Sequence, residues 1–452
     1  MTQDYRQLKL RVTSCELFFL PCPTRVPLKF GAETITSCEN ARVCLHLCAE
    51  DGREACGWGE TPLSAAWAWP AALSFKDRER RMKEFCDDLA GAWREVSGQG
   101  HAMDIGWEFL EERLDSLLAA ANVGQPAEMP HLAALICNSA FDLALHDAYG
   151  KLVGKPVYET YNGQYMARDL AVYLEDQRFA GQYPQDFLLA DSPQQLPVWH
   201  LVGGKDLLTE ADLTGQEQDD GYPVLLTKWI ERDGLFCLKV KLTGNDAAWD
   251  YERMVRVGKI ALQYKCRHLS PDFNCQVQDP EYVNTLLDRL QAEYPEIYAL
   301  ILYVEQPFPY DLEAHRIDVH SVSSRKPLFM DESAHNWRLI KLGQELGWTG
   351  VALKVCKTQT GALLSACWAK AHNIQLMVQD LTNPRLAIIP HVLLAAKVGT
   401  IMGVECNAAQ FYPEASRQEA QFHPGLYERR KGVVDLSTIQ GNGFGYNIPT
   451  LS

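Results

Sequence analysis

The chain has 452 residues, of which 47% are hydrophobic and 22% are charged, a composition typical of a soluble globular protein. This length is too great for one average domain and suits a barrel with a smaller companion. The formal net charge of -15 disfavours nucleic acid or an anionic membrane surface as a partner. It does not exclude an anionic small molecule, because a bound cation can reverse the local sign.

The cysteines do not indicate a disulfide framework. Several of the 14 cysteines lie inside apolar runs, as small buried thiols do. No CxxC pair occurs, so a zinc finger or a thioredoxin-like site has no support. The chain begins MTQDYRQLKLRV without an apolar signal core, and no run reaches membrane-spanning length. We therefore expect a reduced, cytoplasmic protein with no membrane partner.

Residues 1–155 predict an α+β unit. Apolar side chains alternate with others in the run ARVCLHLC, and the Asp-Gly pair that follows supplies a hairpin turn. Apolar residues then recur at helical spacing from Met82 to Val96. A further helix is predicted through LAALICNSAFDLALHDAYGK, ending near Gly154.

Residues 156–410 predict a parallel barrel. From about residue 235, short apolar runs each end in a polar or charged residue and are followed by a helical segment. The ends lie between 23 and 33 residues apart, which fits one strand, one helix and two loops per unit. With the earlier run LPVWHLV they make eight strands, the number that closes such a barrel. The seven runs end at Lys241, Asp272, Glu305, Asp331, Lys354, Asp380 and Glu405.

Other segments lack this rhythm. Residues 160–230 are polar and rich in turn formers on both sides of LPVWHLV, and we interpret them as loops or an insertion. Residues 411–452 form a tail that we expect to return to the N-terminal unit, so that both cap the barrel mouth. Loops near residues 22–37 and 61–72 are expected to close over the mouth and set specificity.

Three carboxylates end consecutive predicted strands. The C-terminal ends of parallel barrel strands converge on one face, so Asp272, Glu305 and Asp331 are expected to meet there. Together they would repel one another, and a divalent cation removes that cost. Three oxygen ligands without Cys or His favour a hard ion, with Mg²⁺ first and Mn²⁺ as the alternative.

Lysines flank these carboxylates on both sides. Lys239 and Lys241 share a face of the preceding strand, and Lys354 ends the strand after Asp331. A nearby dication and a second ammonium are expected to lower the pKa of a lysine, which makes it a usable general base. Lys241 and Lys354 are thus predicted to face one substrate carbon from opposite sides. Lys357 is interpreted as a solvated residue at a helix start.

An ordered set of motifs accompanies these residues. They are KVK at 239–241, PDFN at 271–274, VEQPFP at 304–309, MDES at 330–333 and LKVCK at 353–357, preceded by GWGETP at 57–62 and FDLALHDAYGK. The set resembles the enolase superfamily, and within it the mandelate racemase and muconate lactonizing enzyme group. The resemblance implies a (β/α)₈-type barrel with an α+β capping domain built from the N-terminal region and the tail. It also implies a homo-oligomer that acts on a small-molecule carboxylate.

The resemblance implies a reaction as well. Members of this group remove the proton next to a substrate carboxylate through a metal-stabilised enolate. Carried over by position, the three carboxylates hold Mg²⁺, while Lys241 and Lys354 are the bases on the two faces. Lys239 assists the base and the substrate carboxylate, and Asn274 lies behind the metal ligands.

The sequence also departs from parts of the family pattern. The His–Asp dyad of the mandelate racemase subgroup is absent, so the lysine pattern is that of the muconate lactonizing subgroup. Asp380 is expected to orient Lys354 or to contact substrate. At the eighth strand the segment ECN, with Glu405 and Asn407, stands where dipeptide epimerases carry DxD. The segment ECN therefore differs from the DxD pattern of dipeptide epimerases, and a dipeptide substrate stays open.

Several functions are compatible with this pattern. A racemase or epimerase, a cycloisomerase and a dehydratase all begin with the same proton abstraction. A metal-dependent barrel aldolase or lyase is an alternative, in which Lys354 or Lys241 forms a Schiff base. A non-catalytic, metal-stabilised binding protein is the third possibility, against which the two lysines argue because scaffolding needs no buried amines.

Overall fold

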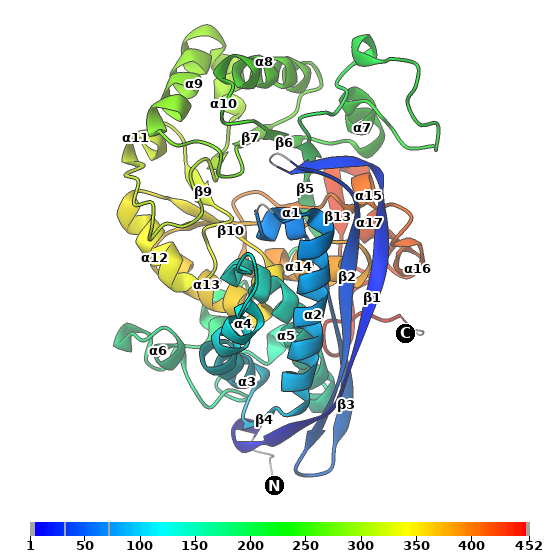
Figure 1. Ribbon diagram of the computed structural model, residues 1–452, viewed down its shortest axis with the longest axis vertical. Helices are drawn as coiled ribbons and strands as arrows, with labels where there is room; N and C mark the ends of the chain where they lie inside the picture. Colours follow the sequence, from blue (N-terminus) through cyan, green and yellow to red (C-terminus); the bar gives the residue numbers. More distant parts are fainter. Residues whose placement is uncertain (1–4, 31–32, 71–72, 449–452) are drawn as a thin grey trace.

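An antiparallel sheet of four strands forms the N-terminal part of this computed structural model, which describes residues 5–30, 33–70 and 73–448 (Figure 1). The predicted Asp-Gly turn is confirmed, with Gly52 at a φ of 87°. In the loops predicted to set specificity, residues 31–32 and 71–72 lie outside the described residues. In sheet order, the strands are β3 (Glu54–Pro62), β2 (Glu33–Ala49), β1 (Lys9–Phe30) and β4 (Ser97–Gln99).

Helices pack on one face of this sheet. The predicted alternation in β2 is confirmed, because Val43, Leu45 and Leu47 are buried in the core shared with these helices. Both predicted helices are present, and the second ends at Gly154, whose φ of 69° is left-handed. The elements are η1 (Tyr5–Gln7), α1 (Ala65–Ala68), α2 (Phe75–Arg94), α3 (Ala102–Phe109), η2 (Leu110–Leu114), α4 (Asp115–Asn122) and α5 (His131–Val153).

Helix α5 approaches β3 closely at two glycines. A Cβ atom on Gly57 would lie 2.1 Å from the carbonyl oxygen of Ala144, and one on Gly59 would lie 2.0 Å from that of Ala140. Only glycine allows this backbone contact. Because side chains alternate along a strand, the residues next to these glycines, including Cys56 and Trp58, face away from the helix.

The predicted parallel barrel of eight strands is confirmed, and LPVWHLV lies within its first strand. Ile401, just before the last strand, donates from its backbone N to the carbonyl oxygen of Leu376 at 2.9 Å, which joins the two ends of the sheet. In sheet order, the strands are β11 (Gln375–Val378), β10 (Gly350–Leu353), β9 (Leu328–Met330), β8 (Val304–Glu305), β7 (His268–Asp272), β6 (Cys237–Lys241), β5 (Gln195–Val202) and β12 (Val404–Glu405).

The helices between these strands lie around the outside of the barrel (Figure 1). Their apolar faces and the outer faces of the strands form one large core. The helices are α7 (Leu226–Asp233), α8 (Ala247–Gln263), α9 (Pro280–Glu293), α10 (Pro295–Leu300), α11 (His320–Ser323), α12 (Trp337–Leu346), η7 (Val355–Lys357), α13 (Gln359–Ala371), η8 (Arg385–Ala387) and α14 (Ile388–Val398).

The segment at 160–230 contains β5 and α7, and otherwise only short helical turns. These turns, with the one just before the segment, are η3 (Val157–Glu159), α6 (Leu170–Tyr173), η4 (Gln177–Phe179), η5 (Pro184–Phe187) and η6 (Glu210–Asp212). Within the described residues, no helix combines the length and the apolar character needed to cross a bilayer. All 14 cysteines carry free thiols.

The C-terminal tail contacts both sheets. Arg42 of β2 donates from Nη2 to Glu419 at 3.0 Å, and the tail strand pairs antiparallel with β5. The domain boundaries drawn from the sequence stay a prediction. The tail elements are α15 (Ala408–Phe411), α16 (Arg417–Ala420), α17 (Pro424–Tyr427), η9 (Arg430–Gly432) and β13 (Val433–Asp435).

Candidate active site

Charged side chains meet at the C-terminal ends of the barrel strands. The strand register pairs Lys241 with Asp272 and Asp272 with Glu305, so these three residues stand in a row on β6, β7 and β8. Asp331 and Lys354 follow directly after β9 and β10. All five are buried, with at most 8% of any residue exposed. The parallel pairing thus brings together the residues that the sequence predicted at strand ends.

Lys239 lies at the centre of this row. Its Nζ donates to Glu305 Oε1 at 2.6 Å and to Glu405 Oε2 at 3.2 Å, and it lies 3.1 Å from Asp272 Oδ2. Gln379, directly after β11, accepts a further hydrogen bond from it at 3.2 Å. One ammonium group therefore compensates three buried carboxylates.

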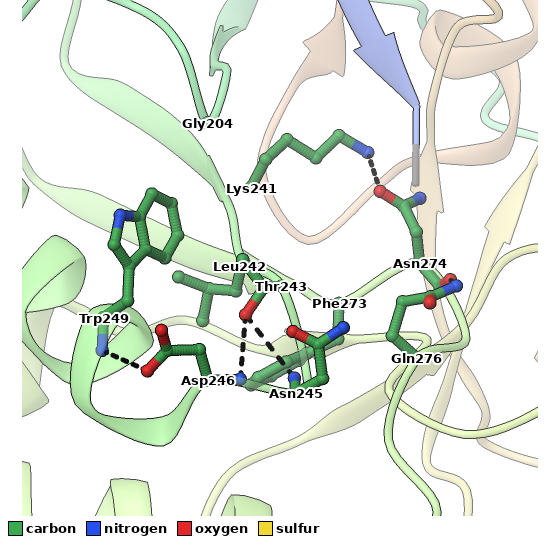
Figure 2. Close-up of a pocket in the computed structure, with 10 residues that line it drawn as sticks. All are labelled: Gly204, Lys241, Leu242, Thr243, Asn245, Asp246, Trp249, Phe273, Asn274 and Gln276. Carbon is green, nitrogen blue, oxygen red and sulfur yellow. Dashed lines mark hydrogen bonds between the residues drawn. The ribbon is translucent and has the colours of Figure 1, made fainter. Parts of the chain in front are cut away.

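Lys241 opens onto a cavity of about 530 Å³ (Figure 2). Its Nζ donates to Asp272 Oδ2 and, at 2.9 Å, to Asn274 Oδ1. The cavity is bounded mainly by the loops after β6 and β7, including Thr243 and Trp249. Lys241 is thus held at the edge of a space large enough for a small ligand.

Lys354 occupies the other end of the row. Its Nζ lies 3.2 Å from Asp331 Oδ2 and donates at 2.8 Å to the carbonyl oxygen of Asp380. The ring of Trp67, from α1 of the N-terminal segment, lies 5.0 Å from the same Nζ. An aromatic face at this distance attracts an ammonium group and shields it from water. The N-terminal segment therefore contributes a wall to the barrel site.

Lys357 was interpreted from the sequence as solvated, and this is wrong. Only 3% of the residue is exposed, and its Nζ donates to the backbone carbonyl of Asp331 and lies 5.7 Å from the Trp67 ring. The 3₁₀ turn η7 directs the side chain inward. Burial lowers the pKa of Lys357 below its ordinary value. Although Lys357 ends the motif LKVCK, its position in the sequence did not distinguish it from a helix-start residue.

Asp380, Glu405 and Asn407 form a hydrogen-bonded network behind the lysines. Asn407 donates from its backbone N to Asp380 Oδ2 at 2.8 Å and from Nδ2 to Glu405 Oε1 at 2.7 Å. The backbone carbonyl oxygen of Asp380 therefore accepts a hydrogen bond from Lys354, while its carboxylate accepts hydrogen bonds from Asn407. This contact fits the orienting role predicted for Asp380, and both predicted roles stay predictions.

Glu332 was not selected from the sequence, although it stands in the MDES motif. Asn274 Nδ2 donates to its Oε1 at 2.9 Å, while Oε2 is buried without a hydrogen-bond partner. Burial, followed by repulsion from Asp331, raises the pKa of Glu332 to about 7. A strand-end pattern could not identify it, because it follows the strand-end carboxylate.

The facing carboxylates shift the pKa values of Lys239 and Lys354. Burial alone lowers the pKa of Lys239 and Lys354, but facing carboxylates reverse the effect and raise both above their ordinary value. Burial also raises the pKa of Glu305 well above its usual range, with Asp272 adding to the shift. The predicted lowering rests on a bound dication and stays a prediction, while the facing carboxylates raise the pKa of Lys239 and Lys354 in the arrangement described.

The three predicted metal ligands fit a hard divalent cation in donor type and strand placement. From the residues that the structure describes, Asp331 Oδ1 accepts no hydrogen bond, although it is buried and Lys357 Nζ lies 3.7 Å away. The carboxylate oxygens of Asp272, Glu305 and Asp331 nevertheless face lysines and do not form a set within 4.8 Å of one another. All three carboxylates can bind one ion only if these side chains turn toward each other and Lys239 loses its ion pairs with Asp272 and Glu305.

Comparisons place the chain among known proteins. The family model described as "Enolase C-terminal domain-like" matches residues 224–450. The aromatic dipeptide epimerase of Herpetosiphon aurantiacus is 25% identical over 252 residues, which cover 55% of this chain and 66% of that protein. The match thus spans just under two thirds of that relative.

Solved structures share the whole fold. A mandelate racemase/muconate lactonizing protein from Herpetosiphon aurantiacus matches with a TM-score of 0.63 and 18% identity, covering 96% of this chain and 98% of that one. A dipeptide epimerase from Enterococcus faecalis V583, complexed with Mg and the dipeptide L-Leu-L-Tyr, matches with a TM-score of 0.62 and 16% identity, covering 96% and 99%.

Proposed function

Because the chain belongs to the enolase superfamily, in its mandelate racemase and muconate lactonizing enzyme group, we propose that it is an isomerase. Its reaction removes the proton from the carbon next to a substrate carboxylate and returns it. The observation that carries this proposal is the position of Lys241 and Lys354, which end strands four apart in an eight-stranded barrel. Two amines on opposite sides of one carbon can give up and take up a proton on both faces.

Among the contacts that the structure describes, each lysine has a charged and a neutral acceptor. Lys241 contacts Asp272 and the Asn274 side-chain oxygen, and Lys354 contacts Asp331 and the Asp380 carbonyl oxygen. A neutral amine still donates an N–H to an amide oxygen while its lone pair points elsewhere. The two neutral acceptors can therefore orient each lysine both before and after it takes the proton.

We propose that Asp272, Glu305 and Asp331 hold Mg²⁺, with Mn²⁺ as the alternative. When bound, the ion would supply positive charge that offsets the negative charge developing on the substrate carboxylate. Carboxylates that turned toward such an ion would leave Lys239 and Lys354, and losing these partners would lower the raised pKa of both lysines. Lys239, which contacts two of these carboxylates, is proposed to assist the base and the substrate carboxylate.

Solvent exchange tests this proposal. The protein with Mg²⁺ is incubated in D₂O with dipeptides, N-acyl amino acids and sugar acids, and α-deuterium is followed by NMR. We expect exchange in at least one acid, and its loss in the double variant Lys241→Ala/Lys354→Ala. Lys228→Ala, at an exposed helix position, is the control. Absence of exchange across the panel, or exchange in the double variant, contradicts the proposal.

A further inference from the structure

Three soft donor side chains gather on the outer face of the N-terminal sheet. Cys44 and His46 lie two residues apart on β2 and so share a face, and the register places Cys56 of β3 directly opposite His46. The core residues of β2 point to the other face, toward the helices. The cluster therefore lies on elements that the barrel reaction does not use.

The three donors have the spacing of ligands around one ion. Cys44 Sγ lies 3.7 Å from His46 Nε2, and all three ligand atoms lie within 4.8 Å of one another. With Zn–S bonds of about 2.3 Å and Zn–N bonds of about 2.0 Å, tetrahedral sulfur and nitrogen ligands lie about 3.6 Å apart. Among the residues that the structure describes, this is the one set of three His, Cys, Asp or Glu that meets such a spacing.

The Cys44 and Cys56 thiols are hydrogen-bonded to each other. A hydrogen bond with the Cys44 thiol is the first cause that lowers the pKa of Cys56, and the same contact raises the pKa of Cys44. The ammonium group of Lys151 also favours the thiolate form of Cys56, and it donates to the Cys56 carbonyl oxygen at 3.1 Å. A metal ion can replace the protons of both thiols, because cysteine binds metal as the thiolate.

A fourth ligand position lies on the neighbouring strand. Glu16 of β1 is directly opposite Cys44 in the strand register, so its side chain points to the same face. It is exposed, and its charge contributes to raising the pKa of Cys44. Either this carboxylate or a water molecule can complete a four-coordinate site.

We propose that Cys44, His46 and Cys56 bind Zn²⁺, with Glu16 or water as the fourth ligand, and that the ion ties β2 to β3. On binding, the Cys44 and Cys56 thiols each give one proton to solvent, and the neutral imidazole binds through Nε2. Thiolate and imidazole ligands select zinc, whereas the carboxylates of the barrel select magnesium, so the two sites take different ions.

A disulfide explains the cluster less well. Cys44 stands opposite Trp58 and Cys56 stands opposite His46, so the two cysteines are diagonal neighbours across the ladder. A disulfide also gives no reason for the imidazole to face Cys44. A search for CxxC motifs does not find this site, because Cys56 lies on a second strand. Only the register of β2 and β3 brings Cys56 close to Cys44 and His46.

Cobalt titration tests the proposal in the reduced, full-length protein after metal removal, with excess Mg²⁺ present. One equivalent of Co²⁺ should produce a thiolate-to-cobalt charge-transfer band and the visible bands of a tetrahedral site, and one equivalent of Zn²⁺ should abolish them. Cys44→Ser and Cys56→Ser should each lose the charge-transfer band, and His46→Ala should weaken binding. Cys48→Ser, on the same face of β2 but outside the cluster, should keep it.

A second measurement uses the wild-type protein and so does not depend on how the variants fold. Zn²⁺ should protect Cys44 and Cys56 from alkylation, while Cys48 is unaffected, as read by peptide mass spectrometry. The proposal is overturned if the wild-type protein gives no charge-transfer band, or if the band survives in both serine variants. A Cys44–Cys56 disulfide recovered from protein purified without reductant also overturns it.

Discussion

The indole ring of Trp67 lies 5.0 Å from the Nζ of Lys354, although Trp67 belongs to helix α1, after the antiparallel sheet, and Lys354 follows strand β10 of the barrel. Trp67 is 7% exposed, and Lys357 Nζ lies 5.7 Å from the same ring. Helix α1 thus covers the amine proposed as one of the two bases. The candidate site consequently depends on the position of the N-terminal segment as well as on the barrel.

The Trp67 wall should affect turnover. A desolvated cation–π contact contributes about 1–2 kcal/mol, so we expect Trp67→Ala to lower kcat/KM by roughly tenfold. Trp67→Phe keeps an aromatic face and should retain most of the activity. Initial rates on an acid found in the exchange panel give the comparison, with circular dichroism to check folding. A folded Trp67→Ala variant with wild-type kcat/KM would disprove a role for this contact.

The close approach of α5 to β3 should make Gly57 intolerant of a side chain. In Gly57→Ala, the new Cβ meets the Ala144 carbonyl oxygen at 2.1 Å, so the backbone must shift. We expect the free energy of unfolding to fall by about 1–3 kcal/mol, as in other overpacked cores. Urea denaturation of the wild-type protein and of Gly57→Ala measures this difference in the free energy of unfolding.

Gly91 provides the matched control for this substitution. It lies within helix α2, and an added Cβ meets nothing within 4 Å. Gly91→Ala should therefore stabilise the protein by about 0.5–1 kcal/mol through helix propensity. Equal effects of the two substitutions would show that the contact with α5 does not limit Gly57.

Buried histidines should make the protein less stable in mild acid. Burial lowers the pKa of His391 to about 4, while the unfolded chain titrates near its ordinary value of about 6.5. Between these values the unfolded state binds more protons, so stability is lost as the pH falls from about 6.5 toward about 4. For one such group the loss approaches about 3 kcal/mol.

Variants isolate the contribution of His391. His391→Gln can keep a donor toward the Glu405 carbonyl oxygen, which His391 Nε2 approaches at 2.7 Å, and should reduce the pH slope by up to one proton. Denaturation curves across this pH range supply the slopes, and an unchanged slope in His391→Gln contradicts the assignment.

Metal dependence should follow the three strand-end carboxylates. Asp272→Asn, Glu305→Gln and Asp331→Asn should each weaken Mg²⁺ binding, measured by calorimetry, and abolish α-proton exchange. Glu296→Gln, at an exposed position on α10, should bind Mg²⁺ as the wild type does. A fully chelated protein that exchanges α-protons at the wild-type rate would contradict the need for the ion.

The barrel was predictable because its signal is local and repeated. Each strand is an apolar run with a charged end. Parallel pairing brings these ends to the same face of the barrel, independently of the sequences of the helices between them. Strand ends were therefore accurate to within two residues, as at Asp380, which follows the end of β11 at Val378. Likewise, the period-two pattern of β2 was sufficient to identify its buried face.

Features that depend on contacts between distant segments of the chain could not be predicted from local sequence patterns. Lys357 is buried because η7 turns it toward Asp331 and beneath Trp67, and no spacing rule encodes that turn. The raised pKa of Lys354 follows from which carboxylate faces it. The pairing of His46 with Cys56 likewise requires the register of β2 and β3.

The central claim is that Lys241 and Lys354 act on opposite faces of one carbon, and face-specific deuterium exchange tests it most directly. Each enantiomer of an active acid is incubated in D₂O with Lys241→Ala and, separately, with Lys354→Ala. We predict that each variant loses net turnover but still exchanges the α-proton of one enantiomer, a different one in each case. Exchange of both enantiomers by either variant would contradict the account.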